Sequence, residues 1–120
     1  MQRREFQRLV LKAVEDIPDQ FRDALENIDI QVRWRPTPAE LRSAGVRRGS
    51  LFGVYIGVPL PERDHYSMTM PDTIVIYQQT HERHCRSEAE IVEQVRQTVL
   101  HEIGHYLGID EDRLHELGIG

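Results

Sequence analysis

The stretch SEAEIVEQVRQTVLHEIGHYLG, residues 87–108, brings together the structural and chemical signals of this chain. Ser87 followed by Glu90 has the pattern of an N-terminal capping box, and Gly108 stands where a left-handed helix C-cap belongs. Apolar residues recur between these ends at helical spacing. The stretch therefore predicts one long helix with a buried stripe made of Val92, Val95, Val99, Leu100, Ile103 and Leu107.

The end of this helix carries His101 and His105, with Glu102 directly after the first histidine. Residues four apart lie about 40° apart around a helix axis and one turn above each other, so both imidazoles can reach one metal ion. Two such histidines and a carboxylate that takes a proton from an activated water are the arrangement of a zinc peptidase helix. We therefore predict one Zn²⁺ ion held by His101 and His105, with Glu102 as the general base, on the side of the helix away from its buried stripe.

A catalytic zinc ion needs a third protein ligand and a position open to water. A glycine three residues after the second histidine lets the chain turn back beneath the metal, and Gly108 has this spacing. The pattern resembles the metzincin signature, in which a third histidine stands six residues after the second. Glu111 occupies that position here, so the resemblance implies Glu111 as the third ligand. The alternatives are Asp110, Asp112, His115, and an acidic turn that only caps a short tail helix.

The rest of the chain predicts two further helices and three strands. An amphipathic helix over 4–17 and a short helix over 19–25 precede a strand over 28–34, whose strict alternation is typical of a half-buried strand. The apolar run 51–58 indicates a strand buried on both faces, and 73–77 indicates a third strand. We predict an α+β fold with a small, mostly antiparallel or mixed sheet packed on the N-terminal helix and the long active-site helix.

Composition limits the class of protein. A chain of 120 residues, 39% hydrophobic and 29% charged, fits one globular domain over residues 1–120. The formal net charge of −5 argues against a nucleic-acid partner. No apolar run approaches the roughly 18 residues of a membrane span, and the basic N-terminus lacks the apolar run of a signal peptide. The single cysteine, Cys85, suits the reducing cytoplasm, where we expect this protein.

Three segments together resemble the small bacterial zincin-like proteins, a zinc metallopeptidase family. They are Leu51–Leu60, Pro71–Tyr77 and Val99–Leu117, and the last carries the helix motif and the acidic turn. The resemblance covers most of the chain. It implies a minimal zincin-like fold, one zinc ion and a peptide or protein substrate.

The function expected from these observations is zinc-dependent peptide hydrolysis. The alternative is a metal-binding but catalytically inactive zincin-like domain with a regulatory or interaction role. A hydrolase that acts on something other than a peptide is a third reading. An edge strand, either 51–58 or 73–77, would hold an extended substrate by backbone pairing. The sequence leaves the oligomeric state open.

Some polar residues outside the long helix are weaker candidates. An electrophilic group that helps the tetrahedral intermediate is usual in such sites. The candidates for it are Tyr66, Tyr77, Tyr106, His65 and His81. The polar segment 78–86 also carries His81, His84 and Cys85, whose spacing matches no strong template for a second metal site.

Overall fold

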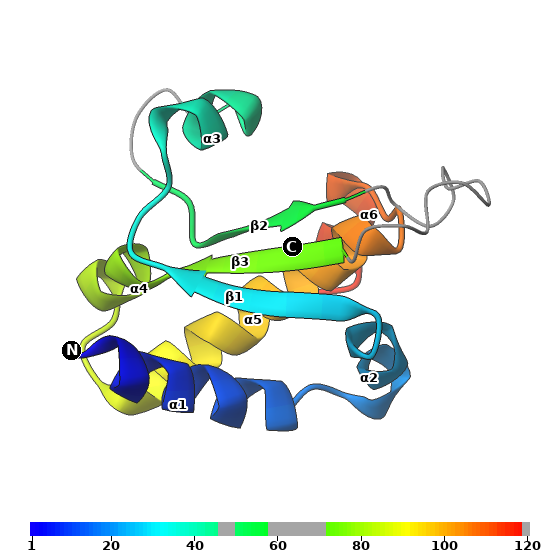
Figure 1. The fold of residues 1–120 in the computed structure, drawn as a ribbon. Coiled ribbons are helices and arrows are strands. Elements are labelled where there is room, and N and C mark those ends of the chain that lie inside the picture. Colours follow the sequence, from blue (N-terminus) through cyan, green and yellow to red (C-terminus); the bar gives the residue numbers. More distant parts are fainter. Residues whose placement is uncertain (46–49, 58–71, 119–120) are drawn as a thin grey trace.

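A computed structural model describes residues 1–45, 50–57 and 72–118 of the chain and shows a small sheet with helices packed on one face (Figure 1). The predicted α+β fold is confirmed, and residues 59–71, which lie between the strands predicted over 51–58 and 73–77, are outside the described residues. The elements are α1 (Arg3–Glu15), α2 (Asp19–Leu25), β1 (Ile28–Arg33), α3 (Pro38–Ser43), β2 (Gly53–Ile56), β3 (Asp72–Tyr77), α4 (Gln78–His84), α5 (Glu88–Tyr106) and α6 (Glu111–Glu116).

The sheet is mixed, with strand order β1-β3-β2. β3 pairs parallel with β1 and antiparallel with β2, so β3 is central and β2 forms one edge. The prediction that 51–58 is buried on both faces is wrong, because β2 is short and half-exposed, with Ile56 47% exposed. An apolar run has the same composition whether its strand lies at the edge or in the centre of a sheet. The strand buried on both faces is β3, and the edge strand left undecided by the sequence is β2.

The hydrophobic core lies between the sheet and the two long helices, α1 and α5 (Figure 1). The stripe predicted on α5 is mostly right, but Val92 and Leu107 are only half-buried, whereas Ile91 and Tyr106 are buried. The buried face is wider than the predicted stripe because α5 packs against α1 on one side and against β2 and β3 on others. The fully buried core residues of these layers include Phe6, Ala13, Ile74, Ile76, Val95, Val99 and Ile103.

The caps predicted for α5 are present. The Ser87 side chain accepts a hydrogen bond from the Glu90 N–H at 3.1 Å. The Glu90 carboxylate accepts a hydrogen bond from the Arg86 N–H at 3.1 Å. A reciprocal capping box would instead use the N–H of the N-cap residue itself, Ser87. At the other end Gly108 has φ of 78°, the predicted left-handed conformation, and the Ile109 N–H donates to the Gly104 carbonyl at 2.9 Å.

Helix α4 occupies most of the polar segment 78–86, which the hydrophobic pattern does not mark as a helix. It is held by His81, a polar residue that is fully buried between the rings of Phe6 and Phe52. His81 Nδ1–H donates to the Tyr77 carbonyl at 2.8 Å. Burial disfavours the charged imidazolium and lowers the pKa of His81 to about 4.

Helix α6 packs on α5 at Gly104, the fourth residue of the HEIGH motif. A Cβ added at this glycine would lie 2.3 Å from Leu114 Cδ2, and Leu114 is fully buried. The missing side chain therefore lets the two helices approach. Together with the turn at Gly108, this contact sets where the first residue of α6 lies.

Gly104→Ala should overpack this contact and lower the free energy of unfolding by about 1–3 kcal/mol. Urea denaturation measures this change. Leu114→Ala alone should cost about 2–5 kcal/mol through the cavity it leaves. In the double variant Gly104→Ala/Leu114→Ala, the new methyl group fills part of that cavity. The double variant should therefore lose less free energy of unfolding than the two single variants lose in sum. Strictly additive costs would show that Gly104 and Leu114 do not share a packing site.

His81 should make the fold acid-sensitive. Its pKa is lower in the folded chain, about 4, than the unfolded value of 6.5, so the unfolded chain binds more protons between these values. The resulting stability is complete above pH 6.5 and falls as the pH drops toward 4, by roughly 3 kcal/mol in total. His81→Gln should flatten the stability profile in this window relative to wild type. His115→Gln, a change at an exposed histidine, is the matched control, and an equal effect of both changes would contradict the prediction.

Candidate metal centre

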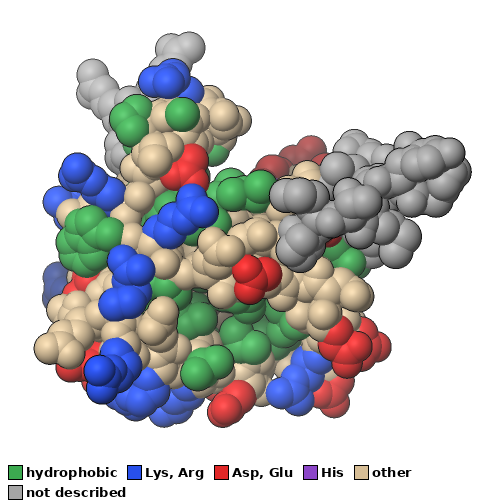
Figure 2. Space-filling model, in the orientation of Figure 1, with side chains coloured by type: hydrophobic (Ala, Val, Ile, Leu, Met, Phe, Trp, Pro, Cys, Tyr) green, Lys and Arg blue, Asp and Glu red, His purple; other side chains and the backbone are tan. Residues whose placement is uncertain are grey.

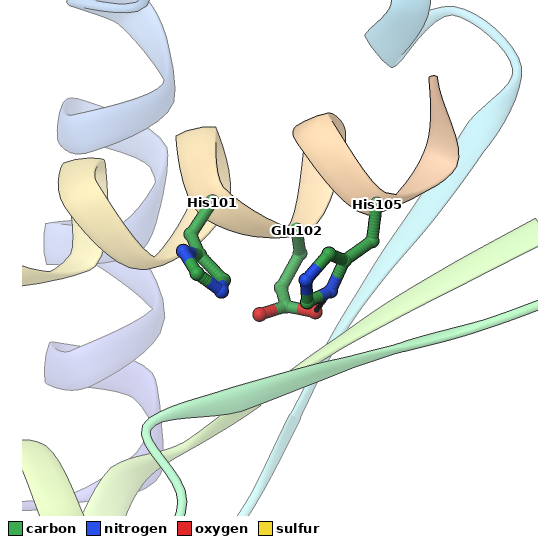
Figure 3. A group of neighbouring side chains, drawn as sticks. All are labelled: His101, Glu102 and His105. Carbon is green, nitrogen blue, oxygen red and sulfur yellow. Dashed lines mark hydrogen bonds and ion pairs between the residues drawn. The ribbon is translucent and has the colours of Figure 1, made fainter. Parts of the chain in front are cut away.

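His101, Glu102 and His105 come together on α5, as the helical spacing predicts (Figure 3). Each offers a ligand atom, and these atoms all lie within 4.8 Å of one another. The imidazole ring centroids of the two histidines are 4.6 Å apart. The three side chains project from α5 toward β2 (Figure 3). In the orientation of Figure 1, the space-filling view shows no histidine on the part of the surface that the described residues form (Figure 2).

Glu111, the first residue of α6, brings a carboxylate to the same two rings. Its Oε1 lies 2.8 Å from His105 Nε2 and 3.1 Å from His101 Nε2. The turn at Gly108 reverses the chain, and the contact between α6 and α5 then directs this side chain back toward the histidines.

The alternative third ligands are placed differently. Asp110 caps α6, because its Oδ1 accepts a hydrogen bond from the Arg113 N–H at 2.9 Å. Asp112 and His115 are exposed on α6 and make no hydrogen bond to either histidine of the centre in the described structure. Of the four residues that the sequence left open, Glu111 is therefore the one whose side chain meets both imidazoles.

Glu102 is only 6% exposed, because β2 passes over it. Its Oε1 accepts a hydrogen bond from the Tyr55 N–H of β2 at 2.9 Å and another from His105 Nδ1 at 3.0 Å. The other oxygen, Oε2, makes no hydrogen bond to any residue that the structure describes. The role of the Tyr55 amide has no signal in the local sequence, because a backbone N–H is common to every residue except proline.

The two carboxylates shape the electrostatics of the centre. The hydrogen bond from His105 to Glu102 raises the pKa of His105 to about 9, with Glu111 adding to the effect. The hydrogen bond from His105 in turn lowers the pKa of Glu111. Because a histidine ligand must be neutral, a metal ion would displace a proton from His105 when it binds.

The donor set fits a zinc ion. Zinc ligands at about 2.0–2.1 Å in a tetrahedron lie roughly 3.3 Å from each other. The two separations between Glu111 Oε1 and the histidine Nε2 atoms, 2.8 and 3.1 Å, are close to this spacing. His105 Nδ1 donates to Glu102, which orients the ring so that Nε2 faces Glu111. A carboxylate that fixes the orientation of a ligating imidazole in this way is usual at metal sites.

The other polar candidates lie away from this centre or outside the described residues. The Tyr77 hydroxyl donates to Glu40 Oε2 at 2.7 Å, and His81 is buried beneath α5 with its Nε2 3.2 Å from Thr98 Oγ1. Tyr106 is buried with its ring against that of Tyr55. Within the described chain, His81, His84 and Cys85 do not form a metal-binding group. The candidates His65 and Tyr66 lie in the segment that the structure leaves undescribed.

Comparison with known proteins agrees with the fold and with the nature of the site. A conserved hypothetical protein from T. thermophilus has a similar structure, with a TM-score of 0.59 and 21% sequence identity over 89% of this chain and 94% of that one. No curated protein matches the sequence. None of the described helices is long and apolar enough to cross a membrane. The model of the zincin-like metallopeptidase family matches residues 25–120, which include α5, α6 and all three strands, and the chain therefore belongs to that family.

Proposed function

We propose that this protein is a zinc-dependent peptide hydrolase in which His101, His105 and Glu111 hold one zinc ion. The observation that carries the proposal is the convergence of both histidine Nε2 atoms on one Glu111 oxygen, beside a buried glutamate. When bound, zinc supplies a Lewis acid that lowers the pKa of a water toward about 7 and polarises a carbonyl. Membership of a metallopeptidase family favours a peptide bond as the target.

Glu102 is the proposed general base. Its Oε1 is held by the Tyr55 amide and by His105 Nδ1, so the carboxylate cannot rotate freely. The second oxygen is left to accept a proton from the attacking water and to pass it to the leaving amine. This arrangement fixes the base by its neighbours before a substrate arrives, which lowers the cost of orienting it during the reaction.

No strand in the described residues pairs with the outer edge of β2, and this edge is the proposed binding site for an extended peptide. The Tyr77 N–H donates to the Phe52 carbonyl at 2.9 Å, so Phe52 and every second residue after it pair with β3. The backbone groups of Gly53 and Tyr55 then face the open side, as the bond from the Tyr55 amide to Glu102 illustrates. A peptide paired beside Gly53 would lie along α5 and next to the histidines.

Glu102→Ala should abolish hydrolysis while zinc binding is retained, since the base is not a proposed ligand. Loss of a general base lowers the rate by about 10²–10⁴-fold. Cleavage of a mixed peptide library by zinc-loaded protein measures the effect, with Glu15→Ala on the exposed face of α1 as the control. A loss of less than about tenfold in Glu102→Ala would contradict the mechanism. Zinc binding without any cleavage by wild type would instead favour the inactive metal-binding alternative.

Glu111→Gln should weaken zinc binding by at least about 100-fold, since loss of a residue that only orients a ligand already costs 10–100-fold. His105→Ala should do the same. Competition with a chelator of known zinc affinity measures the change in protein purified without a histidine tag. Asp112→Asn and His115→Gln are matched controls on the same helix. A larger loss in either control than in Glu111→Gln would assign the third ligand to that residue instead.

A further inference from the structure

A pocket of about 410 Å³ adjoins the metal centre. One wall is the segment Ser50–Gly53, which leads into β2, and the other is α5 over the two turns before His101. His101 and Glu102 themselves line the pocket, so it opens directly onto the donor group. Its volume lies at the lower end of the range of about 300–1,000 Å³ for small-molecule sites, which suits one large side chain.

The polar groups of this pocket are mostly engaged by the protein itself. The Ser50 hydroxyl lies 2.8 Å from Thr80 Oγ1, and the Thr98 hydroxyl donates to the Gln94 carbonyl at 2.9 Å. The Gln97 amide donates to Glu93 at 3.1 Å. The amide of the Gln94 side chain, by contrast, makes no hydrogen bond to any residue that the structure describes, so it is available to a ligand.

The charges of the lining are also paired. Apart from His101 and Glu102, the charged residue among the described lining is Arg96. Its guanidinium holds the Glu93 carboxylate through two contacts, at 2.6 and 2.9 Å. Apart from His101 and Glu102, the described lining therefore offers no unpaired charge, and a carboxylate or ammonium group placed away from those two residues would lose water without gaining an opposite charge, which is costly. Leu51, Phe52 and Leu100 supply apolar surface instead.

We propose that this pocket selects the substrate residue beside the cleaved bond, that it accepts a large uncharged side chain and rejects a charged one, and that Gln94 is the selecting residue. The proposal rests on the proposed function, because it treats His101 and Glu102 as the place where a peptide reacts. A peptide paired beside Gly53 would direct a neighbouring side chain between the two walls.

Binding of hydroxamate probes to zinc-loaded protein tests the pocket without requiring turnover. Acetyl-Xaa hydroxamates and malonyl-hydroxamate derivatives of Xaa amides place the side chain on either side of the zinc-binding group. With Xaa as Leu, Phe, Gln, Asp or Lys, calorimetry should give at least about tenfold tighter binding for the uncharged members of one series. Equal affinity across both series, or no binding of any member, would overturn the proposal.

Charge-changing variants at Gln94 make the test specific. Gln94→Arg should improve binding of the Asp probe by about tenfold, and Gln94→Glu should do so for the Lys probe. Gln20→Arg, at an exposed position of α2, is the matched control. Either Gln94 change that alters no more than this control does would overturn the assignment of Gln94. Selective binding of the probes without cleavage of any peptide would support the proposed selectivity of the pocket and contradict the proposed hydrolase function. Cleavage of peptides with unselective binding of the probes would support the hydrolase function and contradict the selectivity.

Discussion

The close approach of α5 to its neighbours at two glycines is the constraint on which the centre depends. A Cβ at Gly53 would lie 2.7 Å from Thr98 Cγ2, and one at Gly104 would lie 2.3 Å from Leu114 Cδ2. The first contact lets β2 run close enough over α5 for a backbone amide to reach Glu102. The second lets α6 return close enough for Glu111 to reach the histidines. Both glycines are needed because of close packing, and neither has positive φ.

Burial of Glu102 requires compensation, and the fold provides it from both sides. A carboxylate taken out of water needs donors, and Oε1 has two of them, a strand amide and an imidazole. The same imidazole contacts Glu111 through its other nitrogen, so His105 links the buried acid to the exposed one. Neither acid can move without changing the hydrogen bonds of this ring. The orientation of the base and the geometry of the donor set are therefore set by one shared residue.

Local periodicity allowed much of α5 and its site to be predicted from the sequence. The relation of His101 to His105 follows from helical geometry alone, and Ser87 and Gly108 mark the ends of the helix by their own backbone chemistry. Where the structure depended on tertiary contacts, the sequence was insufficient. The runs 51–58 and 73–77 are similarly apolar, and only strand pairing places one at the edge and the other at the centre. Helix α4 is held by buried polar residues, Gln78, Thr80 and His81, which no hydrophobic pattern reveals.

The position of Glu111 on α6 couples the proposed metal site to one of the two shortest helices in the described part of the chain. Six residues are too few to form a stable helix in isolation, so α6 depends on the Asp110 cap and on burial of Leu114 against Gly104. A metal ion held by Glu111 and two residues of α5 would tie α6 to α5 at a second point. Binding that favours one arrangement of the chain stabilises that arrangement by the same free energy. In a protein with a core this small, the packing that positions the acid and the metal that it would hold therefore support each other.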